Sequence, residues 1–290
     1  MSVRRDLLVV AIGGHALSSP AADATLAGER AAAAAAGREL AALAADRRLL
    51  LVHGNGPQVG RLLGAESNLD DLDIRVAQTQ GELGYLLAAG LGAASGEAAV
   101  ALLTRVRVDA ERANDPEKPI GPILDQRPDA PHVELPGGRG WRLTVPSPLP
   151  LDVLEYAQIR MLLETSHVVA GGGGGVPVAA DGRPVAGVID KDRVAALLAI
   201  ALGADALVIG TDVDAAYRNF ATPSARRIER LSTKEAEALL AAGEFAPGSM
   251  APKVASAAAF VSATGRRAVI ASMGQLREAL EGRAGTLLQD

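Results

Sequence analysis

The 290-residue chain contains no cysteine, few aromatic residues and no excess of basic residues. The absence of cysteine excludes disulfide bonds, thiol catalysis and zinc sites that need cysteine ligands. With one Trp, three Tyr and three Phe, the sequence offers no series of aromatic side chains on which nucleic acid bases could stack. A formal net charge of -5 provides no positive field for a polyanion, so we expect no nucleic-acid and no membrane partner.

Long hydrophobic runs are also lacking. The first apolar run, residues 7–12, follows two arginines as a secretory leader would, but it ends at Gly13-Gly14. It is too short for a leader core or a membrane span, and it is typical of a buried strand. We therefore expect a cytoplasmic protein, with which the absence of cysteine agrees.

Apolar strand-like runs alternate with helical patterns along most of the chain, and this favours a mainly parallel sheet with helices on both faces. The expected strands are residues 7–12, 49–53, 99–104, 168–171, 206–210 and 267–271. The expected helices are residues 25–45, 73–91, 151–164, 191–202, 233–242 and 252–264. The sequence thus predicts a three-layer αβα sandwich in the α/β class.

Proline and glycine interrupt this alternation between residues 112 and 142. We interpret the segment as a small protruding subdomain, or lid, inserted in the fold. An ordinary surface loop is the alternative.

Five consecutive glycines, residues 171–175, follow an apolar β-branched run, and Asp190-Lys191-Asp192 comes shortly after them. Backbone without side chains lets N–H groups approach a bulky anion, and a nearby ammonium can neutralise its charge. This combination is typical of phosphoryl transfer. The alternatives are a flexible connector for the glycines and a solvated surface for the charged triplet.

Two further glycine turns follow predicted strands, at Gly13-Gly14 and at Gly54-Asn55-Gly56. Neither has the spacing of a dinucleotide fingerprint or a Walker loop, so another phosphate-binding architecture is expected. Loops at the carboxyl ends of parallel strands can line one crevice. Plain tight turns remain the alternative, and His53 can be structural or catalytic.

Polar residues also follow the strand expected at 206–210, namely Thr211, Asp212, Asp214 and Tyr217. Such acids bind ribose hydroxyls or metal-linked water, or they cap a turn. Met250 and Lys253 lie near the start of the helix expected at 252–264, where a nucleotide phosphate is favoured.

Taken together, these segments resemble the carbamate kinases of the amino acid kinase superfamily, in order and over nearly the whole chain. The likeness rests on Val-Val-Ala-Ile-Gly-Gly at 9–14, His-Gly-Asn-Gly-Pro-Gln-Val-Gly at 53–60, Gln-Gly at 80–81, Gly-Tyr at 84–85, Lys-Pro-Ile-Gly-Pro at 118–122, Val-Pro-Ser-Pro at 145–148, the five glycines, Val-Ile-Asp-Lys-Asp at 188–192, Thr-Asp-Val-Asp at 211–214, Phe-Ala-Pro-Gly-Ser-Met at 245–250 and Pro-Lys at 252–253.

The resemblance implies one amino acid kinase-like domain over residues 1–290, working as a homodimer with ATP or ADP and Mg2+. The implied reaction is reversible phosphoryl transfer between ATP and carbamate, giving ADP and carbamoyl phosphate. It is commonly run toward ATP synthesis in arginine or purine catabolism. No side chain is expected to ligate a metal directly.

The resemblance also implies roles for individual positions. The implied catalytic residues are Lys191, Asp192, Lys253 and Lys118, the last reaching in from the inserted subdomain. The implied substrate-binding residues are Gly13, Gly14, His15, Gly54, Asn55, Gly172 and Gly173. The implied nucleotide-binding residues are Thr211, Asp212, Asp214, Tyr217 and Met250.

The sequence departs from the family pattern at His15, where the pattern has asparagine, and at Ala251, where it has glycine. An imidazole is bulkier than an amide and changes its hydrogen-bonding character on protonation. Two alternative functions therefore stay open. One is a related small-carboxylate kinase with an altered acceptor, and the other is a catalytically inactive protein that binds nucleotide or carbamoyl phosphate.

Overall fold

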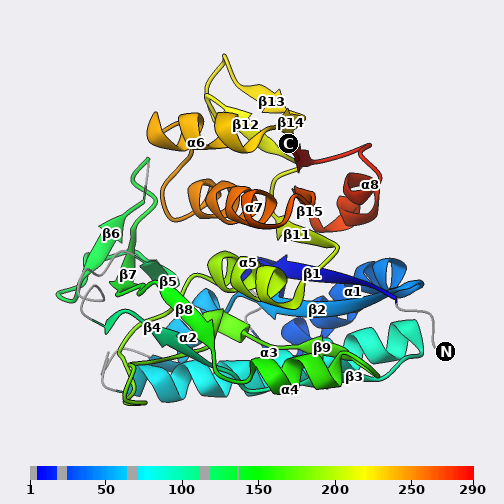
Figure 1. The fold of residues 1–290 in the computed structure, drawn as a ribbon. Helices are drawn as coiled ribbons and strands as arrows, with labels where there is room; N and C mark the ends of the chain where they lie inside the picture. Colours follow the sequence, from blue (N-terminus) through cyan, green and yellow to red (C-terminus); the bar gives the residue numbers. More distant parts are fainter. Residues whose placement is uncertain (1–4, 18–24, 64–70, 111–117, 136) are drawn as a thin grey trace.

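The computed structural model describes residues 5–17, 25–63, 71–110, 118–135 and 137–290, although not the side chains of residues 15, 16 and 122. A central eight-stranded sheet has the order β14-β16-β15-β11-β1-β2-β9-β3 (Figure 1). Its strands are β1 (Asp6–Ile12), β2 (Arg47–His53), β3 (Ala99–Ala101), β9 (His167–Val169), β11 (Ala206–Thr211), β14 (Arg230–Leu231), β15 (Ala268–Ser272) and β16 (Thr286–Leu288). Neighbouring strands are parallel except for β15 and β16.

Helices cover both faces of this sheet. Their bounds are α1 (Leu26–Ala44), α2 (Gly56–Leu63), α3 (Leu72–Ser95), α4 (Tyr156–Leu162), α5 (Lys191–Leu202), α6 (Thr233–Ala241), α7 (Met250–Thr264) and α8 (Leu276–Leu280). In β1, Val9 and Ala11 pack in one core with α5 and α7, whereas Leu8 and Val10 pack in another with α1, α3 and α8. The alternation of side chains along a strand therefore produces two cores and three layers, which confirms the predicted fold class.

Most elements differ from their predicted bounds at one end or both, and three of these differences change the description of the fold. Strand β3 ends at Ala101 rather than at residue 104, and β9 ends at Val169 before the glycines. The helix expected over 151–164 is only α4, because residues 150–153 form strand β8 (Pro150–Val153) and pair with β4 (Arg105–Val108). The apolar run 149–154 fits either structure, so pairing with β4 decided the outcome.

Smaller sheets surround the central one. Strand β10 (Val176–Val178) joins β4 and β8, and β12 (Ala216–Arg218) forms a hairpin with β13 (Arg226–Ile228). In the segment interpreted as a lid, β5 (Lys118–Leu124), β7 (Trp141–Val145) and β6 (His132–Glu134) form an antiparallel sheet that projects at the left of Figure 1. Residues 112–117 of that segment, and residue 136, lie outside the described part of the chain.

The order of the central strands brings the predicted site loops together. Strands β11, β1, β2 and β9 are consecutive and parallel, so their carboxyl ends meet at one edge of the sheet. Gly13, Gly54, Gly171 and Asp212 follow these four strands directly or within two residues. Topology alone therefore gathers the glycine turns and the acidic loop on one side of the molecule.

Helices α1 and α3 pack at close range through glycine. A Cβ atom placed on Gly90 of α3 would lie 2.7 Å from the backbone oxygen of Ala33 in α1. By contrast, a Cβ placed on Gly81, also in α3, would meet no atom within 4 Å. The same substitution at these two positions therefore has opposite consequences for packing.

We predict that Gly90→Ala lowers the free energy of unfolding by about 1–3 kcal/mol, because the two backbones must separate. Gly81→Ala should raise it by up to about 1 kcal/mol, since alanine favours an exposed helix. Urea denaturation of both variants checks the pair. Equal shifts of the same sign would contradict the packing described here.

Candidate active site

A buried cluster of three charged side chains lies at the carboxyl edge of the sheet. Lys191 Nζ donates to Asp192 Oδ1 at 2.6 Å, and Lys253 Nζ donates to Asp192 Oδ2 at 3.0 Å. Lys191 and Asp192 are only 8% and 2% exposed. Lysines from distant parts of the chain therefore place two ammonium groups on opposite oxygens of one carboxylate. The ion cluster of Lys191, Asp192 and Lys253 keeps a net positive charge, which suits a phosphoryl group.

The pKa values of the two lysines are shifted in opposite directions. Burial lowers the pKa of Lys191, and the neighbouring Lys253 charge acts in the same direction, although Asp192 opposes both. Burial also acts on Lys253, but its ion pair with Asp192 outweighs burial and raises the pKa. The carboxylate thus keeps Lys253 charged, while Lys191 is the lysine that releases a proton more readily.

Asp190 links this cluster to the small antiparallel sheet. It is the N-cap of α5, where Oδ1 accepts from the N–H groups of Asp192 and Arg193. Its other oxygen accepts from Lys118 Nζ at 3.3 Å, and Lys118 also donates to the carbonyl of Ile189 at 2.9 Å. Burial disfavours the charged carboxylate, but the nearby lysines lower the pKa of Asp190 below its usual range. Lys118 is therefore held at the start of α5, next to the residue that precedes Lys191.

The glycine turns pack against one another and against the cluster. A Cβ placed on Gly54 would lie 2.8 Å from the backbone nitrogen of Gly14 and 3.2 Å from Cδ of Lys191. A Cβ on Gly172 would lie 2.3 Å from Nε2 of His53. Any side chain at these positions would displace its neighbours, so the close approach requires glycine. The loops after β1, β2 and β9 thus form one continuous surface next to Lys191.

The five-glycine loop folds back over the second turn. Gly171, Gly173, Gly174 and Gly175 have positive φ, which favours glycine over any other residue. A Cβ on Gly173 would lie 2.2 Å from Nδ2 of Asn55. The loop is fully buried, and this compact arrangement excludes a flexible connector.

A pocket with an empty volume of about 550 Å3 lies at the end of β11. Thr211, Asp212, Tyr217 and Met250 line it, together with Val213, Ala215, Phe220, Glu244, Phe245, Ala246 and Ser249. Asp214 does not line the pocket but accepts a hydrogen bond from the Tyr217 hydroxyl at 2.9 Å and pairs with Arg227 at 3.2 Å. Its carboxylate therefore fixes the position of the Tyr217 ring.

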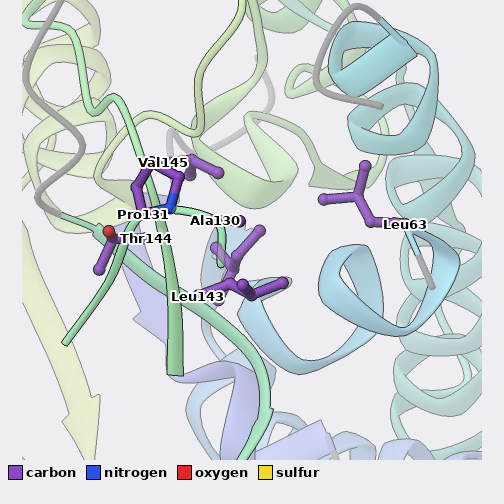
Figure 2. Close-up of a pocket in the computed structure, with 7 residues that line it drawn as sticks. Leu63, Ala130, Pro131, Leu143, Thr144 and Val145 are labelled. Atoms are coloured by element: carbon purple, nitrogen blue, oxygen red, sulfur yellow. The ribbon is translucent and has the colours of Figure 1, made fainter. Parts of the chain in front are cut away.

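Another pocket, of about 290 Å3, lies between α2 and the small sheet (Figure 2). Leu63, Ile120, Ala130, Pro131, Leu143, Thr144 and Val145 line it. It contains none of the predicted site residues, and its lining has no charged group.

The structure brings together most of the predicted site residues. Gly13 and Gly14 follow β1, but the side chain of His15 lies outside the described part of the chain. The sequence gives no signal for Thr79 and Thr104, which accept hydrogen bonds from the loops at Asn55 and Gly171. It marks Gln80 only within the family element Gln80-Gly81, and Asp190 only as a charge favourable at a helix start.

His53 is buried behind the loops rather than exposed at the surface of the site. It is 1% exposed, and its Nδ1 lies 3.1 Å from the carbonyl of Gly54. Burial lowers the pKa of His53 to about 4, and the charge of Lys191 adds to the effect of burial. The imidazole is therefore neutral at physiological pH, with Nδ1 donating to Gly54 and Nε2 facing Gly172.

This burial predicts a pH dependence of stability. Between about pH 6.5, the ordinary pKa, and about pH 4, the unfolded chain binds a proton at His53 that the folded chain does not. Stability from this residue is present above that window and is lost as pH falls through it, with a slope of up to about 1.4 kcal/mol per pH unit.

Urea denaturation of wild type and His53→Gln across this window checks the prediction. In the variant, the pH dependence of the free energy of unfolding should be smaller by the contribution of about one bound proton. Burial also lowers the pKa of His167, but that residue contributes equally to both proteins. Identical slopes in the two proteins would rule out the neutral, buried state of His53.

Comparisons with known proteins agree with this geometry. The amino acid kinase family matches residues 6–272. A carbamate kinase from Halobacterium salinarum is 45% identical over 257 residues, covering 82% of this chain and 83% of its own length. A carbamate kinase from Escherichia coli K12 is 40% identical over 97% of this chain and 98% of its own.

Solved structures give the same result. A carbamate kinase from Giardia lamblia bound to citric acid has a TM-score of 0.88 at 32% identity, with 98% of each chain covered. The same protein bound to AMP-PNP has a TM-score of 0.85 at 32% identity over the same share of each chain. The chain therefore belongs to the amino acid kinase family and, within it, to the carbamate kinases.

Proposed function

We propose that the protein transfers a phosphoryl group reversibly between ATP and carbamate, giving ADP and carbamoyl phosphate. One observation carries the proposal: Lys191 and Lys253 share the Asp192 carboxylate beside three glycine-rich turns. Relatives that match nearly the whole chain are carbamate kinases, and the Giardia lamblia relative binds the ATP analogue AMP-PNP.

We assign the carbamoyl phosphate side to the turns after β1, β2 and β9. Backbone N–H groups at Gly13, Gly14 and Gly54, and at Gly172 and Gly173, would hold phosphoryl oxygens. Asn55 would orient the planar carbamoyl group, and His15 would lie beside the acceptor. The packing of Gly54 against Gly14 and Lys191 supports this assignment.

We assign the nucleotide side to the pocket at the end of β11. Thr211, Asp212, Tyr217 and Met250 would surround the nucleotide, and Asp214 would act through Tyr217. Mg2+ would enter with the nucleotide, because it binds phosphates and water more readily than it binds an all-protein cage. Within the described residues there is no cluster of three or more acids or histidines that could hold a metal. Asp212 is exposed in the pocket and is available to metal-bound water.

The proposed chemistry is an in-line transfer without a covalent enzyme intermediate. A carbamate oxygen attacks the γ-phosphorus while the bond to the leaving ADP oxygen breaks. Lys191 and Lys253 neutralise the oxygens of the transferring group, and Asp192 keeps both ammonium groups in place. Lys118 lies on β5 of the small sheet and is paired with Asp190. In the proposed step it would leave Asp190 and contact the same phosphoryl group. We propose that the segment 112–142 acts as a lid in this step.

The chain's setting is also proposed on the likeness to carbamate kinases. We propose a cytoplasmic homodimer that makes ATP at the end of arginine or purine catabolism. Strand β3 lies at one edge of the central sheet. Gly84 packs against Ala101 of this strand, so the exposed apolar side chains of Tyr85 and Leu103, next to these residues in the sequence, lie near the edge. That surface fits a subunit contact. Sedimentation at twice the chain mass of 29.6 kDa would support the dimer, and a monomer would contradict it. Within the described residues no helix is long and apolar enough to span a membrane.

A direct test measures ATP formed from ADP and carbamoyl phosphate. Wild type should make ATP, and Lys191→Ala should lower kcat by a factor on the order of 100 to 1,000, as expected when one preorganised charge contact is lost. Lys234→Ala is the matched control, because Lys234 is an exposed lysine on α6.

Each remaining outcome selects another function. Activity that appears only in His15→Asn would favour a kinase with a different acceptor. Nucleotide binding without turnover in wild type, Lys191→Ala and His15→Asn would favour an inactive binding protein. Full activity in Lys191→Ala would exclude the proposed role of this lysine.

A further inference from the structure

Thr104 holds both ends of the five-glycine loop. Its hydroxyl accepts from the N–H of Gly171, the first glycine, at 2.6 Å. Its carbonyl accepts from the N–H of Val176, the residue directly after the last glycine, at 2.9 Å. Thr104 is 0% exposed and lies between β3 and β4, so it belongs to neither flanking strand of the loop. One residue from a different part of the chain therefore fixes where the loop begins and ends.

Gln80 on α3 holds Thr104 with three hydrogen bonds. Its Oε1 accepts from the backbone nitrogen of Thr104 at 3.0 Å and from the Thr104 hydroxyl at 2.9 Å. Its Nε2 donates to the Thr104 carbonyl at 3.1 Å. The two residues satisfy each other's polar groups in a site where Gln80 is only 4% exposed. Buried polar networks of this kind fix a single arrangement when every member is paired.

The preceding residue, Thr79, holds the middle of the loop through Asn55. Asn55 Nδ2 donates to the Thr79 hydroxyl at 2.8 Å, and that hydroxyl donates to the carbonyl of Val76 at 2.8 Å. The Asn55 amide packs directly against Gly173. Two adjacent residues of α3 therefore anchor the loop after β2 and the loop after β9.

We propose that Thr79, Gln80 and Thr104 form a glycine-loop clamp that positions the phosphate-binding backbone for catalysis. The inference rests on the proposed function. Glycines resist distortion less than other residues, because they lack the steric limits of a side chain. Transition-state stabilisation nevertheless needs donors held to within about 0.5 Å. The clamp residues lie outside the loop and hold its backbone donors in position. None of its three residues is charged or placed against the reacting atoms, so all three are positioning residues.

Steady-state kinetics with carbamoyl phosphate and ADP test the clamp through Thr104→Val, which is nearly isosteric but lacks the hydroxyl. We expect kcat/KM for carbamoyl phosphate to fall about tenfold to a hundredfold, the range that corresponds to a lost buried hydrogen bond. KM for ADP should stay within about twofold, since the nucleotide pocket lies beyond β1. Thr104→Ser keeps the hydroxyl and should restore kcat/KM to within about threefold of wild type.

Thr286→Val is the matched control. Thr286 is also 0% exposed, and its hydroxyl likewise accepts from one backbone N–H, that of Ala216, and donates to one carbonyl, that of Ile228. It should destabilise the fold without raising KM for carbamoyl phosphate. Equal losses of kcat in Thr104→Val and Thr286→Val, with both KM values unchanged, would reduce the clamp to ordinary structural support and overturn the proposal.

Hydrogen exchange separates failure of the clamp from failure of the proposed function. The Gly171 and Val176 amides should exchange faster in Thr104→Val than in wild type, and Thr286→Val should leave them unchanged. Unaltered exchange at both amides in Thr104→Val contradicts the clamp, even if no protein makes ATP. Inactive wild type with the expected exchange contradicts the proposed function and the catalytic part of the clamp, while leaving its geometry established. If Thr104→Val does not fold, Gln80→Glu, which loses the donor to the Thr104 carbonyl, provides the same comparison.

Discussion

The shared carboxylate of Asp192 is the interaction on which the site depends. Two ammonium groups that are largely removed from water would repel each other, and each would favour loss of its proton. Asp192 bonds both, one through each oxygen, and so holds them close together in a buried setting. Its position follows from α5, because Asp190 caps the helix and thereby fixes the first turn that carries Lys191 and Asp192. The helix cap at Asp190 therefore determines where the charged groups of Lys191 and Asp192 lie.

The sheet divides the remaining tasks among its strands. The order β11-β1-β2-β9 places the pocket proposed for the nucleotide at one end of a row and the five-glycine loop at the other. The turn after β1 lies between them, and Gly54 after β2 packs against both Gly14 and Lys191. Helix α7 contributes Lys253 near its start and Met250 to the pocket, so one helix contacts both halves. A phosphoryl group that passes from nucleotide to acceptor would move along this row.

Much of this arrangement is visible in the sequence because local rules dictate it. An apolar run that ends in glycines predicts a buried strand followed by an anion-binding turn, and three such turns occur on parallel strands. Asp190-Lys191-Asp192 indicates a helix start, because carboxylates are favoured at the N-terminus of a helix. These signals found Gly13, Gly54, the five-glycine loop and Lys191. The family likeness supplied Lys118, whose local sequence carries no chemical signal.

Other features depend on tertiary contacts that no local pattern encodes. A lone threonine at position 104 and a glutamine at position 80 have no motif between them, yet three hydrogen bonds join them across 24 residues. The local sequence of residues 150–153 predicts part of a helix, but in the structure these residues pair with β4 as a strand. Asp214 was expected at the nucleotide, but Tyr217 and Arg227 bind its carboxylate outside the pocket lining. For Thr104 and for residues 150–153 the bonding partner lies far along the chain. For Asp214 the hydrogen bond with Tyr217 and the ion pair with Arg227 compete with the predicted nucleotide contact.

A double-mutant cycle on Asp192→Asn and Lys191→Met, measured as free energies of unfolding, tests the shared carboxylate most directly. Asp192→Asn leaves two buried ammonium groups without their carboxylate and should cost about 3–5 kcal/mol. Lys191→Met leaves Asp192 paired with Lys253 and should cost less. The double variant removes both charges of one pair, so it should be less destabilised than the sum by about 1–3 kcal/mol. Additivity of the two single effects to within about 0.5 kcal/mol would contradict a carboxylate that holds these charges together.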